Sequence, residues 1–159
     1  MKKFILLSTL LLVLSGSVTY AQKYKNGSDT VKLNKELVKV HNDIAELTSE
    51  LTIARNNLPA IQSKASSAGT DAQDAAVSSS DQASNAVHGS VKDARKAKRK
   101  AKNALGEAKD ARSANNNVDD QIKKIAKLTT QLDKKTQRLK ELETIRTAIN
   151  AQISAQVQQ

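Results

Sequence analysis

The stretch LNKELVKVHNDIAELTSELTIARNNL, residues 33–58, decides the fold because its apolar residues recur in alternating steps of three and four. The members of this seam are Leu33, Leu37, Val40, Ile44, Leu47, Leu51, Ala54 and Leu58. Such a period places all of them on one face of an α-helix, where they pack against other helices. The sequence therefore predicts an all-α protein built as a coiled coil or helical bundle.

Two further seams with similar spacing follow along the chain. The C-terminal seam is again aliphatic, with Lys135 and Arg146 in seam positions, and consists of Ile125, Leu128, Leu132, Leu139, Leu142, Ile149 and Ile153. The middle seam is made of small residues, namely Ala72, Ala76, Ser79, Ala83, Ala86, Ser90, Ala94, Ala97, Ala101, Ala104, Ala108 and Ala111. A buried methyl group contributes about 0.8 kcal/mol and a buried leucine about 1.5–3 kcal/mol, so we expect weak packing in the middle.

Two polar stretches predict turns between these seams. Residues 66–70 (SSAGT) combine small and flexible residues, and Thr70 with Gln73 matches a capping box. Residues 115–117 (NNN) form the second turn signal, while Pro59 predicts a kink or a break. We therefore expect three helices of similar length, at about 30–68, 71–114 and 118–157.

The simplest arrangement of three such helices is an elongated antiparallel bundle with spectrin-like up-down-up topology, whose central helix is alanine-rich. Each helix would be about 60 Å long at roughly 1.5 Å per residue. The alternative is a self-associating coiled coil, in which the first and third helices bury their seams against other copies of the chain.

The N-terminal residues 1–21 match a secretory signal peptide. Lys2 and Lys3 precede an apolar run over residues 4–14, and Ala21 supplies the small residue at the expected cleavage site. An uncleaved membrane anchor is the alternative, although the run is shorter than the ~20 apolar residues of a spanning helix. We expect an exported bacterial protein, periplasmic or secreted, with a flexible segment at 22–29 and one helical domain at 30–157.

The charge of the chain is concentrated in one band. The whole chain carries 26 Lys and Arg against 16 Asp and Glu, a net charge of +10. Within residues 92–112 nine basic residues face three acidic ones, which leaves +6. The densest part consists of Arg95, Lys96, Lys98, Arg99, Lys100 and Lys102. These six are the predicted binding residues, either for an anionic polymer or lipid headgroup or for a protein partner; the alternative is a face that only confers solubility.

No motif in the sequence indicates catalysis. The chain has no cysteine, and His41 and His88 have no carboxylate or second histidine at helical spacing that would complete a metal site. Neither a G-x-S-x-G elbow nor a glycine-rich phosphate loop is present. We therefore expect a non-enzymatic protein without catalytic residues, metal or cofactor. Specific nucleic-acid recognition is disfavoured, because the basic band contains no aromatic residue for base stacking.

The size, the export signal, the basic pI and the helical pattern together resemble the Skp/OmpH family of periplasmic chaperones. That resemblance implies a helical prong that holds an unfolded client. The family's short trimerising strands have no counterpart here, since QKYKNGSDTVKLNKEL at 22–37 leads directly into the seam. The alanine- and lysine-rich middle also resembles late-embryogenesis-abundant repeats, which implies a conditionally folded, stress-protective chain. The sequence thus predicts a structural or interaction role at the cell envelope, with these two as alternatives.

Overall fold

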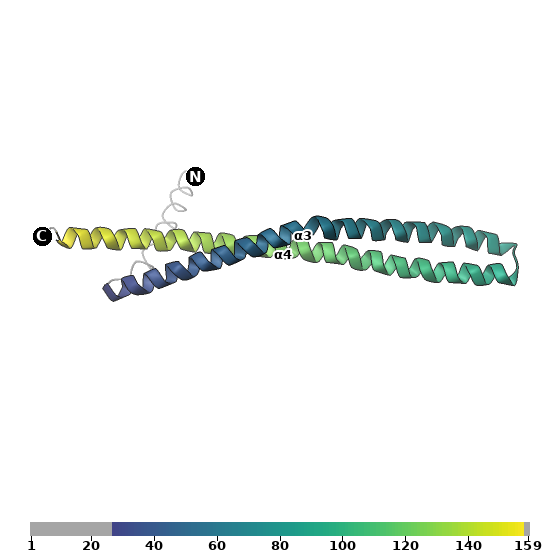
Figure 1. The fold of residues 1–159 in the computed structure, drawn as a ribbon, viewed down its shortest axis with the longest axis horizontal. Coiled ribbons are helices and arrows are strands. Elements are labelled where there is room, and N and C mark those ends of the chain that lie inside the picture. Colours follow the sequence, from purple (N-terminus) through teal and green to yellow (C-terminus); the bar gives the residue numbers. More distant parts are fainter. Residues whose placement is uncertain (1–26, 158–159) are drawn as a thin grey trace, which may run out of the picture. The chain divides into compact units, whose positions relative to one another are not determined.

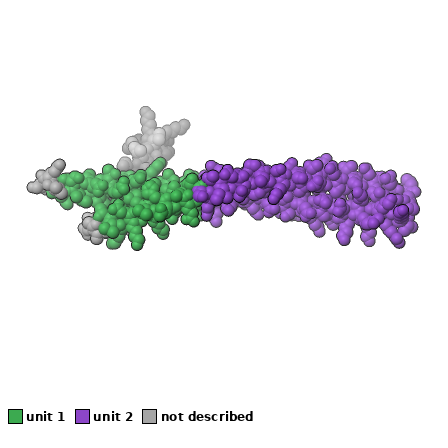
Figure 2. All heavy atoms as spheres, viewed as in Figure 1, with its two compact units in different colours: residues 1–48, 130–159 green, residues 49–129 purple. Residues whose placement is uncertain are grey.

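The computed structural model describes residues 27–157, which form two α-helices, α3 (Gly27–Val87) and α4 (Val91–Val157). The described residues contain no strand, and residues 88–90 connect the helices (Figure 1). The chain divides into two compact units, which are described separately (Figure 2). Unit 1 contains the described residues 27–48 and 130–157, and unit 2 contains residues 49–129. The all-α class is confirmed.

Unit 1 is held by an aliphatic core between the start of α3 and the end of α4. Its buried members are Leu33, Leu37, Val40 and Leu142, and Ile44, Leu139, Ile145 and Ile149 pack against them. All but Ile145 belong to the two seams predicted from spacing. At roughly 1.5–3 kcal/mol for each fully buried side chain, this small cluster is the main stabilising contact of the unit.

Ion pairs across unit 1 show that the two helix segments run antiparallel. Arg138 Nη2 lies 2.7 Å from Glu36 Oε1, and Lys135 Nζ lies 2.6 Å from Asp43 Oδ2, so later residues of α4 pair with earlier residues of α3. Arg138 Nη1 also donates to Glu141 at 3.1 Å. Burial opposes the charge of Arg138, but its hydrogen bonds to Glu36 and Glu141 outweigh that effect and raise its pKa. The Lys135 ammonium likewise lowers the pKa of Asp43.

Unit 2 has a thinner core than unit 1, and the core thins further toward the turn. Its buried residues are Leu51, Ala54, Ala65, Ala111 and Leu128. Across residues 66–110 every residue is half-buried or exposed. The predicted weakness of the alanine-rich middle is therefore confirmed, because methyl groups meeting across the seam remove little surface from water.

The predicted three-helix bundle is not confirmed, since both predicted turns lie inside helices. Residues 66–70 belong to α3, where the Thr70 hydroxyl donates to the Ser66 carbonyl at 3.2 Å and caps nothing. Residues 115–117 belong to α4. The physical reason is the phase of the pattern: the half-buried or buried residues step by three and four straight through both stretches, as Ala65, Ala68 and Ala72 do in α3 and Ala111, Ala114 and Val118 do in α4.

The actual turn lies at residues 88–90 and is held by a capping box that begins α4. The Ser90 backbone N–H donates to Asp93 Oδ2 at 3.0 Å, and its hydroxyl donates to the same oxygen at 2.7 Å. Hydrogen bonds from the Ser90 hydroxyl and backbone N–H, followed by the charge of Lys96, lower the pKa of Asp93 against the opposing effect of burial. The spacing Ser-x-x-Asp at 90–93 is a helix-start signal that the sequence analysis missed.

Pro59 lies within α3 and does not end it, so the predicted break is wrong. The proline is exposed, while Leu58 and Ile61 beside it stay half-buried in the seam. A proline leaves one carbonyl a turn earlier without its helical donor, which weakens the helix locally. Close to that point the Gln121 side-chain amide donates to the Ala54 carbonyl at 2.6 Å, so α4 supplies a polar contact beside the weakened turn.

Alanine substitution of the glycines tests the position of the turn. An added Cβ at Gly69 or Gly106, both inside helices, meets no atom within 4 Å, so each change should stabilise the protein by about 1 kcal/mol. An added Cβ at Gly89 would lie 2.7 Å from the Asn85 carbonyl oxygen, so Gly89→Ala should destabilise it by about 0.5–3 kcal/mol. Urea unfolding followed by circular dichroism measures all three, and a stabilising Gly89→Ala would contradict the turn.

Two predictions made for the N-terminus fall largely outside the described residues. The signal peptide at 1–21 lies entirely outside them. The segment 22–29 is described only from Gly27 onward, where it forms the first residues of α3. Within the described residues, neither helix is apolar enough over a sufficient length to cross a membrane.

Candidate functional site

The predicted basic cluster lies near the start of α4, in unit 2, and the helix divides its members between two sides. The side that meets α3 is marked by the half-buried residues Asp93, Ala97, Ala104 and Glu107 and the buried Ala111. Lys96 and Lys100 lie next to this side. Arg95, Lys98 and Lys102 occupy helical positions remote from it, and Arg99 lies at the border, where it lines a hollow together with Gln82 of α3. All four are exposed.

The two cations near the seam contact groups of the hairpin itself. Lys96 Nζ lies 3.9 Å from Asp93 Oδ1, at the capping box. Lys100 lines a hollow that Asp74 and Asp81 of α3 also line. Lys96 and Lys100 therefore lie beside α3, whereas Arg95, Lys98 and Lys102 face away from it.

The outward side of α4 over residues 91–112 is a continuous basic surface, which we call the cationic face. Its basic members are all exposed and are Lys92, Arg95, Lys98, Arg99, Lys102, Lys109 and Arg112. At about 1.5 Å per residue they span about 30 Å of helix. Of the three acidic residues of the segment, Asp93 and Glu107 are half-buried toward the seam, whereas Asp110 is exposed at the edge of the face, where it lines a hollow together with Ile61 of α3.

The spacing of these cations carries an energetic cost. Like charges three or four residues apart on a helix repel by about 0.2–0.5 kcal/mol per pair, as Arg95 does with Lys98 and with Arg99. Among the described residues, none of the seven cations of the face lies within 4 Å of a carboxylate. A bound anion would relieve this repulsion, so the face is electrostatically suited to an anionic partner.

The opposite helix does not share this charge. Residues 66–87 of α3 contain Asp71, Asp74 and Asp81 and no lysine or arginine. The end of unit 2 is therefore basic on its α4 side and weakly acidic on its α3 side. A negatively charged partner would meet only the α4 side.

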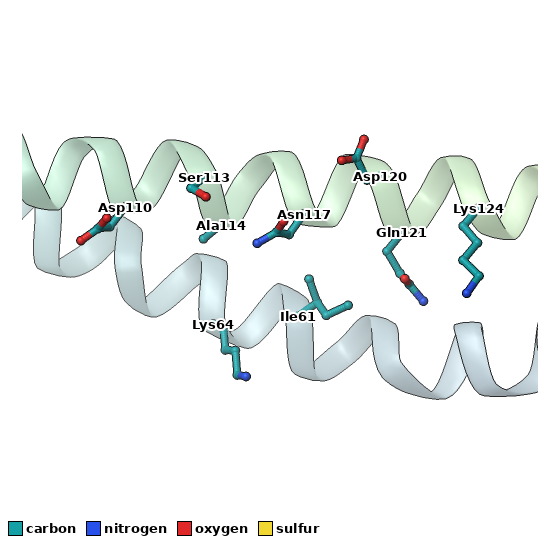
Figure 3. Close-up of a pocket in the computed structure, with 9 residues that line it drawn as sticks. All are labelled: Ile61, Lys64, Asp110, Ser113, Ala114, Asn117, Asp120, Gln121 and Lys124. Atoms are coloured by element: carbon teal, nitrogen blue, oxygen red, sulfur yellow. The ribbon is translucent and has the colours of Figure 1, made fainter.

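Another hollow in unit 2 lies away from the cationic face, between α3 and α4. Its volume of about 610 Å³ is close to the 660 Å³ of the hollow beside Val91, and Figure 3 shows Ile61 pointing toward α4 and Gln121 pointing toward α3 across it. The hollow arises because the α4 residues that meet Ile61 are short or polar, Ala114 and Asn117 among them. Such a mixed, solvent-open lining lacks the enclosed apolar walls of small-molecule sites.

The candidate metal-binding groups remain separate in the structure. Among the described residues, no three His, Cys, Asp or Glu side chains are grouped closely enough to hold a metal ion. His41 and His88 are both exposed, and they lie in different units.

Three basic members of the cationic face were not among the six predicted binding residues. They are Lys92, Lys109 and Arg112, which lie in the basic band but outside its dense part. The helical phase of the neighbouring aliphatic seam would have placed them on the same side as Arg95 and Lys98. The density of basic residues along the sequence does not carry that information, because consecutive residues of a helix point in different directions.

Comparison of the chain with known protein families, with characterised proteins and with solved structures finds no match.

Proposed function

We propose that the chain is an exported, non-enzymatic helical protein of the cell envelope that binds an anionic partner through the cationic face of α4. The observation that carries this proposal is one-sidedness: seven exposed cations share the outward side of the helix, and two of the three acidic residues of the same segment, Asp93 and Glu107, are half-buried toward α3. A face that served only solubility would be expected to mix both signs of charge, as most soluble surfaces do. Exposed lysine and arginine side chains that are not paired within the chain remain available to a partner.

The proposed export follows from the residues 1–21 alone and is tested separately from binding. N-terminal sequencing of the protein recovered from a bacterial periplasm or culture medium should find a chain that begins at Gln22. Recovery of the uncleaved chain in the cytosol would contradict the export while leaving the binding proposal open.

The binding proposal is tested by neutralising the outward cations. We expect the chain from Gln22, which includes every described residue, to be retained on heparin and released by salt. Changing Arg95, Lys98, Arg99 and Lys102 to glutamine should lower the affinity roughly a hundredfold, since each cation near an anionic surface contributes about fivefold and not all touch it at once.

The matched control removes the same charge elsewhere on α4. It changes Lys123, Lys127, Lys134 and Lys140 to glutamine, all of which are exposed. This variant should keep most of its retention, because binding is expected to depend on the cationic face and only weakly on net charge. Equal losses in the two variants would contradict a localised binding face.

A further inference from the structure

Two exposed apolar side chains lie on the cationic face among its charges. Val91 is 73% exposed and Leu105 is 58% exposed, and both occupy the same side of α4 as Lys98. Val91 also lines a shallow hollow, whose other lining residues are Lys92, Arg95, Lys98 and Arg99. An apolar group and a set of cations thus share one surface.

This combination distinguishes among anionic partners. A hydrated polyanion such as a nucleic acid or a wall polymer pairs with the cations but leaves Val91 and Leu105 in contact with water or with charged groups. A phospholipid surface accepts both, because its phosphates pair with the cations while apolar side chains enter the boundary between headgroups and acyl chains. The aliphatic stems of lysine and arginine can lie along the same boundary while their charges stay at the phosphates.

We propose that the partner of the cationic face is an anionic phospholipid bilayer, on which α4 lies side-on over residues 91–112 with Val91 and Leu105 inserted at the headgroup level. This inference rests on the proposed function and adds the class of partner and the mode of contact. The three aspartates and the lack of cations on α3 over residues 66–87 fit this orientation, since that side is repelled by an anionic surface.

The contact is shallow, which sets its expected behaviour. The segment 91–112 contains no Trp, Phe or Tyr, and these residues anchor many interfacial helices. Binding therefore depends mainly on charge and should weaken as salt rises, with a smaller contribution from the two aliphatic side chains.

The experiment measures sedimentation of the chain from Gln22 with lipid vesicles. Vesicles of equal parts phosphatidylglycerol and phosphatidylcholine should bind it, and vesicles of phosphatidylcholine alone should not. The double variant Val91→Ser/Leu105→Ser should bind the anionic vesicles about tenfold more weakly, since two partly inserted side chains lose their transfer from water. Its retention on heparin should be unchanged.

The control variant is Val31→Ser/Val38→Ser, which removes two valines that are 70% and 60% exposed on α3. Its binding to the anionic vesicles should equal that of the parent chain. Circular dichroism confirms that both variants keep their helix content, as expected for exposed positions.

The outcomes separate this inference from the function on which it rests. Retention on heparin without binding to anionic vesicles would overturn the lipid assignment and leave an anionic polymer as the partner. Vesicle binding that Val91→Ser/Leu105→Ser leaves unchanged would overturn the insertion. Failure to bind both heparin and anionic vesicles would overturn the proposed function as well.

Discussion

Leu142→Ala is expected to lower the free energy of unfolding by about 2–5 kcal/mol, which would leave unit 1 largely unfolded. Leu142 is 0% exposed, and it is the α4 member of a core whose other buried residues, Leu33, Leu37 and Val40, all come from α3. Truncating it leaves a cavity at the point where the two helices meet. A two-helix layer has no further elements that could collapse into that space, so we expect a value near the upper end of the range.

The matched control for this prediction is Leu105→Ala. It makes the same chemical change in the same helix, but Leu105 is 58% exposed, so the expected cost is below about 0.5 kcal/mol. Urea unfolding followed by circular dichroism measures both variants. If the two substitutions lowered the free energy of unfolding equally, the core around Leu142 would not be the contact that holds α3 and α4 together in unit 1.

The sequence predicted the helix faces where side chains are large. Leu33, Leu37 and Val40 were assigned to one seam and Leu142 to another, and the structure packs them into one core. Burying each of these side chains is favourable by about 1 kcal/mol or more compared with leaving it exposed. A helix rotated away from this seam would lose that energy at several positions, so the aliphatic pattern determines which face of each helix meets the other.

The same reasoning failed where the seam is alanine. Ala94, Ala101 and Ala108 were assigned to it and are exposed, whereas Asp93 and Glu107 are half-buried in their place. Burying an alanine gains little free energy. The alanines therefore do not determine whether the helix turns the predicted residues or the residues one position earlier toward α3. The phase near the turn instead continues from the aliphatic part of α4, and this continuity also determines which cations face outward.

The helix boundaries could not be predicted from turn composition. Serine, glycine and asparagine favour turns through local preferences of about 1 kcal/mol or less per residue, and packing along a continuous helix overrides them. Half-buried and buried residues continue in steps of three and four through residues 66–70 and 115–117, which places both stretches inside helices. At HGS, residues 88–90, no residue is half-buried, and the spacing from Ala86 to Asp93 is seven.

Proline substitutions should separate the two-helix fold from the predicted three-helix bundle most directly. Asn116→Pro places a proline inside α4, where it removes a backbone N–H and clashes one turn earlier, at a cost of about 3 kcal/mol or more. In a three-helix bundle with a turn at 115–117, the same change would be tolerated, because proline is common in turns.

Val91→Pro is the control, because Val91 is the first residue of α4, directly after the capping residue Ser90. Proline is favoured at this position of a helix, where the N–H has no helical acceptor. We therefore expect Val91→Pro to change the free energy of unfolding by less than about 1 kcal/mol. Both variants introduce one proline into the same chain. Any general effect of proline on the free energy of unfolding is therefore common to both and drops out of their difference. If Asn116→Pro unfolded no more readily than Val91→Pro, α4 would not be continuous across residue 116, and the phase argument for the cationic face would lose its basis.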